Sequence, residues 1–65
     1  MYKNRIREIR KKKGLTLEYV ANVAGISVGY LCHLEKGTRD NPSAQIMDKI
    51  AKALEDNVIT VFFEQ

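Results

Sequence analysis

The sequence predicts an all-α domain of short helices, and three observations support this fold class. The chain has 65 residues, of which 45% are hydrophobic and 29% charged, enough for one small hydrophobic core. Apolar residues recur at spacings of three and four, which is the period of an amphipathic helix. Glycine, serine and threonine stand between these runs, where helices end and begin. The sequence contains no repeat or linker, so we expect residues 1–65 to form one domain.

The first and fourth helices are predicted from their apolar stripes. Over about residues 3–13, Ile6 and Ile9 share one face, and Gly14 follows as the residue that ends the helix. Pro42 and Ser43 begin a later helix. Its apolar residues have the spacing of a buried stripe and are Ile46, Met47, Ile50, Ala51 and Leu54.

The segment between them has the pattern of a helix-turn-helix. Thr16 and Ser27 are expected to cap two short helices, the first of which ends at Gly25. The connection is too short for anything but a tight corner. We expect the helices to come closest near Ala21, where only a small side chain fits, and Gly25 to have a positive φ.

The apolar run at residues 58–63 is compatible with two structures. Its β-branched and aromatic residues would suit a strand, whereas an Asn57 cap would start a short helical face. We favour a short helix or turn over residues 58–61. A strand here would have an unpaired edge and would imply pairing with a second subunit.

Positive charge is concentrated at the N-terminal end of the chain. The net charge is +3, but residues 1–13 hold seven bases and one acid, which is +6, and residues 40–65 hold two bases and five acids, which is −3. Such an asymmetry would orient the domain towards a polyanion. The alternative is a basic helix that is merely solvated.

Composition argues against several classes of protein. The apolar stretches are far shorter than the roughly 20 residues that span a bilayer, and no secretory signal is recognisable. Cys32 and His33 are single residues of their kinds, so neither a disulfide nor a metal site is predicted. The chain also lacks a catalytic constellation and a phosphate-binding glycine loop. We expect a cytoplasmic protein that is no enzyme and needs no cofactor or small-molecule ligand.

Short motifs along nearly the whole chain match one family. They include IREIR at 6–10, KGLT at 13–16, AGIS at 24–27, LEKG at 34–37, NPS at 41–43 and IAKAL at 50–54. Together they resemble the DNA-binding domains of the Cro/Xre (lambda-repressor-like) helix-turn-helix family. The resemblance implies a compact five-helix bundle with residues 28–35 as the recognition helix in the major groove. It also implies that Arg10 and Glu35 form a structural ion pair.

On that fold, the residues of the third helix that the core does not need face the DNA. The base-contacting candidates are Ser27, Val28, Gly29, Cys32 and His33. Relatives often have Arg, Gln, Ser or Asn at the positions of Val28, Gly29 and His33, because those side chains read base edges. Cys32 has a second interpretation, as a small filler or a redox sensor. The departures favour recognition through the DNA backbone and its shape.

Backbone contacts are expected from helix N-termini, hydroxyl groups and cations. The candidates are Thr16, Leu17, Tyr19, Tyr30, Lys36, Thr38 and Arg39, with Lys3, Arg5, Lys12 and Lys13 as weaker ones. Relatives usually have Gln at the position of Leu17, where it bonds a phosphate. Tyr30 has an alternative role, which is to pack at the edge of the core.

The resulting hypothesis is a transcriptional regulator, in particular a repressor of bacterial, phage or mobile-element origin. A single helix-turn-helix reads few base pairs, so we expect a homodimer on duplex DNA with recognition helices about 34 Å apart. The dimerisation candidates are the apolar residues near the C-terminus: Val58, Ile59, Val61, Phe62 and Phe63. Alternatively, Phe62 closes the core.

A rival hypothesis is a protein-interaction or antitoxin-like module with the same fold and weak DNA readout. Leu17, Val28 and Gly29 favour it, because none of them has a hydrogen-bonding side chain. Under either hypothesis no effector domain is expected after residue 65. Control would then come from abundance, dimerisation, a partner protein or Cys32.

Overall fold

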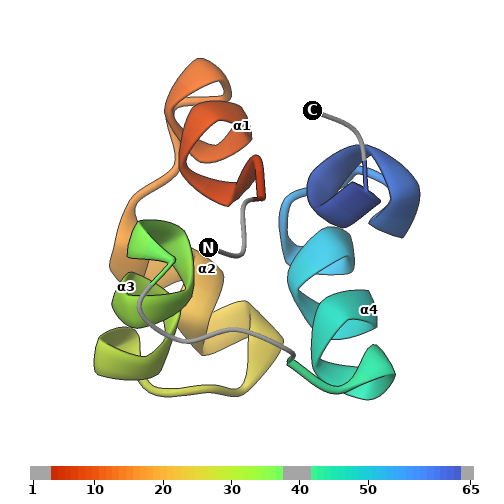
Figure 1. Ribbon diagram of the computed structural model, residues 1–65. Helices are drawn as coiled ribbons and strands as arrows, with labels where there is room; N and C mark the ends of the chain where they lie inside the picture. The colour runs from red at the N-terminus through yellow and green to blue at the C-terminus, as the bar shows by residue number, and fades with distance from the viewer. Residues whose placement is uncertain (1–3, 38–41, 64–65) are drawn as a thin grey trace.

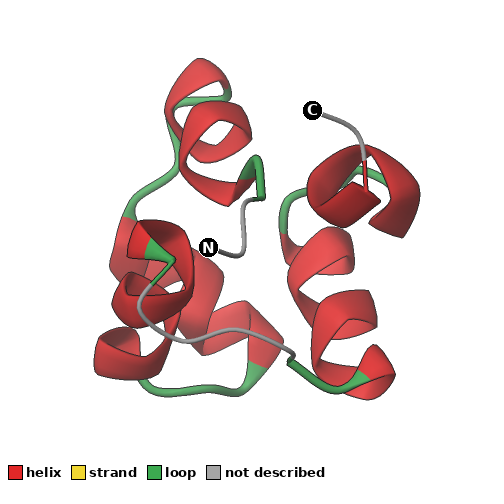
Figure 2. Ribbon diagram, in the orientation of Figure 1, coloured by secondary structure: helices red, strands yellow, loops and turns green. Residues whose placement is uncertain are grey.

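A computed structural model describes residues 4–37 and 42–63, and this part of the chain is helical without a strand (Figures 1 and 2). The all-α prediction is therefore confirmed, and the last apolar run forms a short turn of π-helix instead of a strand. The elements in chain order are α1 (Ile6–Lys12), α2 (Leu17–Ala24), α3 (Val28–Lys36), α4 (Ala44–Ala53) and η1 (Ile59–Phe63).

Side-chain caps start α2, α3 and α4 as the sequence predicts. Thr16, Ser27 and Ser43 each accept a hydrogen bond from the backbone amide three residues on, at 3.0 to 3.1 Å. Asn57 does the same before η1, where its Oδ1 accepts the Thr60 amide at 2.8 Å. Each such cap supplies a partner for an amide that the helix itself leaves unpaired.

The corner between α2 and α3 depends on Gly25. Its φ is 73°, in the left-handed region predicted for it, and the amide of Ile26 donates to the carbonyl of Ala21 at 3.0 Å. This arrangement is a glycine C-cap that reverses the chain within three residues. Ala21 is buried in the core.

All five elements contribute to one core. Its buried residues are Ile6, Ile9, Val20, Ala21, Ala24, Leu31, Leu34, Ile50, Ala51, Ala53, Leu54, Val61 and Phe62. The burial of two pairs of residues differs from the prediction. Ile46 and Met47 are only partly buried, and Val61 and Phe62 are 0% and 2% exposed. Both residues close the core of their own chain, which for Phe62 matches the alternative stated above and corrects the assignment of Val61 and Phe62 to a dimer surface.

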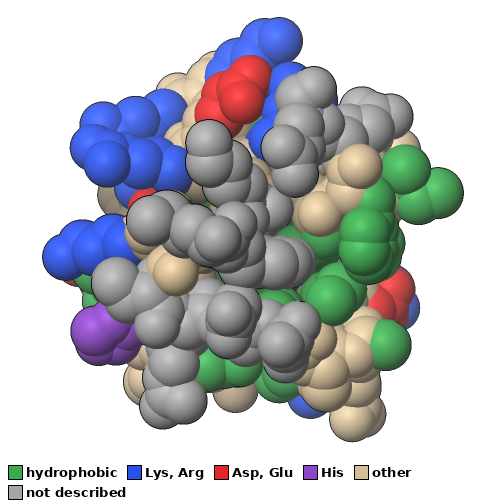
Figure 3. Space-filling model, viewed as in Figure 1, with side chains coloured by type: hydrophobic (Ala, Val, Ile, Leu, Met, Phe, Trp, Pro, Cys, Tyr) green, Lys and Arg blue, Asp and Glu red, His purple; other side chains and the backbone are tan. Residues whose placement is uncertain are grey.

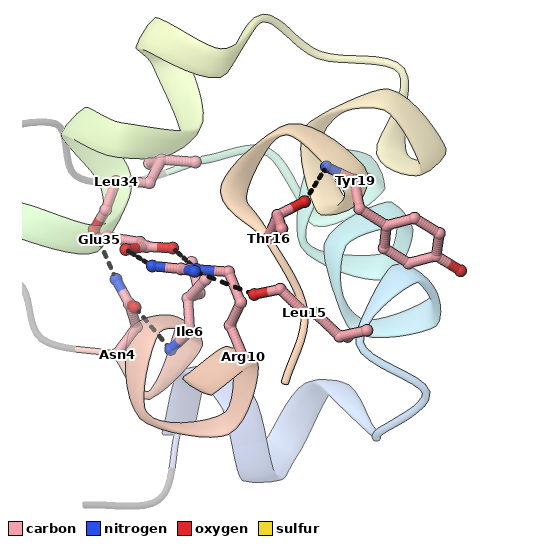
Figure 4. Close-up of polar contacts among 8 residues, drawn as sticks. All are labelled: Asn4, Ile6, Arg10, Leu15, Thr16, Tyr19, Leu34 and Glu35. Atoms are coloured by element: carbon pink, nitrogen blue, oxygen red, sulfur yellow. Dashed lines mark hydrogen bonds and ion pairs between the residues drawn. The ribbon is translucent and has the colours of Figure 1, made fainter. Parts of the chain in front are cut away.

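A polar cluster joins α1 to the C-terminal end of α3 (Figure 4). Arg10 Nε and Nη2 donate to the two Glu35 carboxylate oxygens at 2.6 and 3.2 Å, and Nη1 donates to the carbonyl of Leu15 at 3.0 Å. Asn4 Nδ2 donates to the carbonyl of Leu34 at 2.8 Å. We call Asn4, Arg10 and Glu35 the α1–α3 clasp. The ion pair that the resemblance implies is thus present, whereas the part played by Asn4 was not predicted.

Asn4 also explains where α1 begins. Its Oδ1 accepts the amide of Ile6 at 3.0 Å, so the helix starts at Ile6 and later than predicted. The other end of α1 is tied to α4, because Lys13 Nζ donates to the carbonyls of Leu54 and Glu55 at 2.6 and 2.9 Å. A cation at the C-terminal end of a helix stabilises its unpaired carbonyls.

Loss of one partner of the clasp should destabilise the fold strongly. Arg10→Met leaves the Glu35 side chain, which is 8% exposed, without its cation. We expect a loss of about 3 kcal/mol in the free energy of unfolding, measured by urea denaturation. The double variant Arg10→Met/Glu35→Leu should recover most of this loss, because it removes the stranded charge as well.

The control is the surface pair Lys52–Asp48, whose side chains are 77% and 53% exposed. Asp48→Asn should cost about 0.5 kcal/mol or less. Equal losses from Arg10→Met and Asp48→Asn would contradict the structural role of the clasp.

Two glycines should respond to alanine in opposite ways. At both Gly25 and Gly29, an added Cβ would meet no other atom of the described residues within 4 Å, so packing does not distinguish them. Gly25→Ala places a side chain at positive φ and should cost about 1 to 2 kcal/mol. Gly29 lies within α3, so Gly29→Ala should raise the free energy of unfolding by about 0.5 to 1 kcal/mol. Urea denaturation of both variants measures the difference, and a stabilising Gly25→Ala would contradict the corner geometry.

Candidate nucleic-acid interface

The outer face of α3 gathers most of the residues predicted to contact bases. Leu31 and Leu34 are 0% exposed and fix the opposite face of the helix in the core. Gly29, His33 and Lys36 are exposed, Val28 is 39% exposed, and Cys32 is half-buried. The spacing of these residues by three, four and seven positions brings them onto one side of the helix.

The N-terminal ends of α2 and α3 present unpaired backbone donors. The Ser27 hydroxyl accepts the amide of Tyr30, which leaves the amides of Val28 and Gly29 without an acceptor among the described residues. Thr16 leaves the amides of Leu17 and Glu18 in the same state. Donors at the positive end of a helix dipole are suited to bind phosphate oxygens.

Leu17 and Tyr30 differ from the other predicted backbone contacts. Both side chains are partly buried and pack against the core, which for Tyr30 matches the alternative stated above. Leu17 can therefore reach a phosphate only through its amide. Tyr19 is 47% exposed, and its ring points away from the α1–α3 clasp (Figure 4). The predicted contacts Thr38 and Arg39 lie outside the described residues, as does Lys3.

Several of the basic side chains at the N-terminal end form hydrogen bonds or ion pairs within the chain. Arg10 belongs to the clasp, and the hydrogen bond with Glu35 raises the pKa of its guanidinium. Lys13 caps α4. Arg5 pairs with Glu8 at 3.0 Å, and this bond lowers the pKa of the Glu8 carboxyl.

The remaining charge is distributed unevenly over the surface. Figure 3 shows Lys and Arg side chains along the left edge of the molecule, directly above the chain's histidine, His33. The same view shows hydrophobic side chains gathered on the right, over the region of α4 and η1 in Figure 1. In this view, the Lys and Arg side chains at the left edge therefore adjoin the histidine of α3.

Residues 4–37 and 42–63 contain neither a cluster of metal-ligating side chains nor a membrane-spanning helix. No three His, Cys, Asp or Glu side chains in these ranges lie together as metal ligands would. Neither range contains a helix with the length and apolar character that a membrane crossing requires.

Comparison with solved structures identifies close relatives of the fold. The restriction-modification controller protein C.AhdI from Aeromonas hydrophila superposes with a TM-score of 0.82 at 36% identity, over 89% of this chain and 86% of that one. The biofilm regulator SinR, in a crystal structure with DNA, superposes with a TM-score of 0.80 at 38% identity, over 86% of this chain and 89% of that one.

Sequence comparison leads to the same group. The HTH-type transcriptional regulator SinR of Bacillus subtilis (strain 168) is 35% identical over all 65 residues, and the chain spans 59% of its length. A sequence model described as helix-turn-helix matches residues 6–55, which include α1 to α4. The chain belongs to the helix-turn-helix family.

Proposed function

We propose that this chain binds duplex DNA as a transcriptional regulator, with α3 in the major groove. The observation that carries the proposal is the outer face of α3, where Gly29, His33 and Lys36 are exposed while the opposite face is fixed in the core. The relatives named as HTH-type transcriptional regulators, and SinR crystallised with DNA, support it. We favour repression as its mode of action and the cytoplasm as its location.

Sequence reading would rest on few side chains. Ser27, Cys32 and His33 are the candidates with hydrogen-bonding groups, and Val28 would contact a thymine methyl. Gly29 has open space above it, so a base edge could approach the helix closely there. We infer that affinity depends mainly on phosphate contacts from the helix N-termini, Thr16, Tyr19 and Lys36.

A two-fold dimer would extend the recognised site to two half-sites one helical turn apart. The surface that we propose for it lies on η1, where Ile59 and Phe63 are 63% and 62% exposed. These two side chains adjoin Val61 and Phe62, which anchor η1 in the core. Val58 is partly buried at the same edge and would contribute less.

The protein-interaction module is the second candidate function. The observation that favours it is the absence of hydrogen-bonding side chains at Leu17, Val28 and Gly29. This module would bind duplex DNA weakly or not at all, so measurements of DNA binding separate the two functions.

Binding to duplex DNA should decline steeply with salt. We expect fluorescence anisotropy at 50 to 300 mM KCl to give a log–log slope of several units, about −0.9 for each phosphate contact. Lys36→Ala should weaken binding to every duplex and reduce the slope by about one unit. His33→Ala should change the preference between a duplex enriched from a random pool and a scrambled one.

No binding to any duplex at low salt would contradict the proposed function and favour the interaction module. Equal losses on both duplexes from His33→Ala would show instead that His33 does not read bases.

A further inference from the structure

Arg7 and Lys11 on α1 are exposed cations that take no part in the contacts that hold the described residues together. Both side chains are exposed, and neither has an ion pair or hydrogen bond within the described part of the chain. Arg7 is the second residue of α1, beside the positive end of the helix dipole, where a cation is unfavourable. Lys11 lies four residues later, and like charges at this spacing repel each other. Arg7 thus works against the stability of α1, whereas Lys11 lies in its last turn, where the helix dipole favours a cation.

The clasp shows which way these two side chains face. Arg10 points at Glu35 of α3, and Ile6 and Ile9 lie on the core side of it. At 100° per residue, Arg7 and Lys11 lie about 60° and 100° from Arg10 around the helix, on the side away from the core. Lys12 lies about 160° from Arg10 in the other direction.

The same construction applies to α3. Leu31 and Leu34 lie on the core side of Glu35. Cys32, Lys36 and His33 follow on the other side, at about 60°, 100° and 160°. Because Arg10 and Glu35 join the two helices, the outer sides of α1 and α3 are continuous across the clasp. Figure 3 agrees, since Lys and Arg side chains continue along one edge above the histidine.

We propose that Arg7 and Lys11 bind phosphates of the DNA strand that flanks the groove occupied by α3. Together with Lys36 of α3, they would form one row of phosphate-binding cations. This inference rests on the proposed function. One helical turn separates the two cations by about 6 Å along α1, while one DNA strand presents a charge about every 3.4 Å of helix axis. Two side chains one turn apart can thus meet nearby phosphates of one strand. Basic side chains that bind only phosphates would add affinity without sequence preference.

The test compares two double variants of the full chain with the same charge. Arg7→Gln/Lys11→Gln removes the proposed contacts. The control, Lys49→Gln/Lys52→Gln, removes two exposed cations from α4, and both variants lower the formal net charge from +3 to +1. Binding is measured by fluorescence anisotropy between 50 and 300 mM KCl, on an enriched and on a scrambled duplex.

Arg7→Gln/Lys11→Gln should reduce the log–log salt slope by about two units and weaken binding roughly 10- to 100-fold at 0.1 M salt, equally on both duplexes. The control should keep the slope of the unmodified protein. Circular dichroism should show that Arg7→Gln/Lys11→Gln keeps the helical signal of the unmodified protein, because neither side chain has a partner within the described part of the chain.

Two results would overturn the inference. If the unmodified protein binds DNA and Arg7→Gln/Lys11→Gln keeps its slope, the row ends at Lys36 and the cations serve another partner, such as an acidic protein. A slope that falls equally in both variants would show that only net charge matters. Failure of the unmodified protein to bind either duplex at low salt is a different outcome, since it removes the proposed function itself.

Discussion

The ion pair between Arg10 and Glu35 is the contact on which the position of α3 depends. It joins the first helix to the last turn of the third, with side chains 13% and 8% exposed, and the same guanidinium holds the carbonyl of Leu15 before α2. One side chain thus links α1, α3 and the loop before α2. A partly buried pair with this many hydrogen bonds has a defined geometry, because each bond fixes a direction as well as a distance. The outer face of α3 is presented at a fixed angle as a result.

The basic residues in and next to α1 fall into two sets with different roles. Arg10 and Lys13 are engaged within the chain, Arg10 in the clasp and Lys13 at the carbonyls that end α4. Arg7 and Lys11 are exposed on the side that continues the face of α3. The net charge of the chain therefore overstates the charge that a polyanion can meet, and its position matters more than its sum. α1 acts both as a support for α3 and as part of the same positive surface.

Local features of the structure could be predicted from the sequence, whereas long-range ones could not. The caps at Thr16, Ser27 and Ser43 and the reversal at Gly25 follow from residue type and spacing alone. The Lys13 contact spans 41 residues and has no sequence signal, because any surface lysine has the same local pattern. The run at 58–63 is too short for its period to show which apolar residues face inward, so Phe62 and Phe63 could be separated only by the structure.

In the proposed complex, the clasp presents the outer face of α3, with the adjoining side of α1, to DNA. The most direct test is the titration of ¹⁵N-labelled protein with an enriched duplex, followed by amide chemical shifts. We expect the largest shifts at the starts of α2 and α3, around residues 17–18 and 28–29, and at His33, Lys36 and Arg7, with Lys49 and Lys52 of α4 unchanged. Largest shifts on α4 or η1, with α3 unaffected, would contradict it.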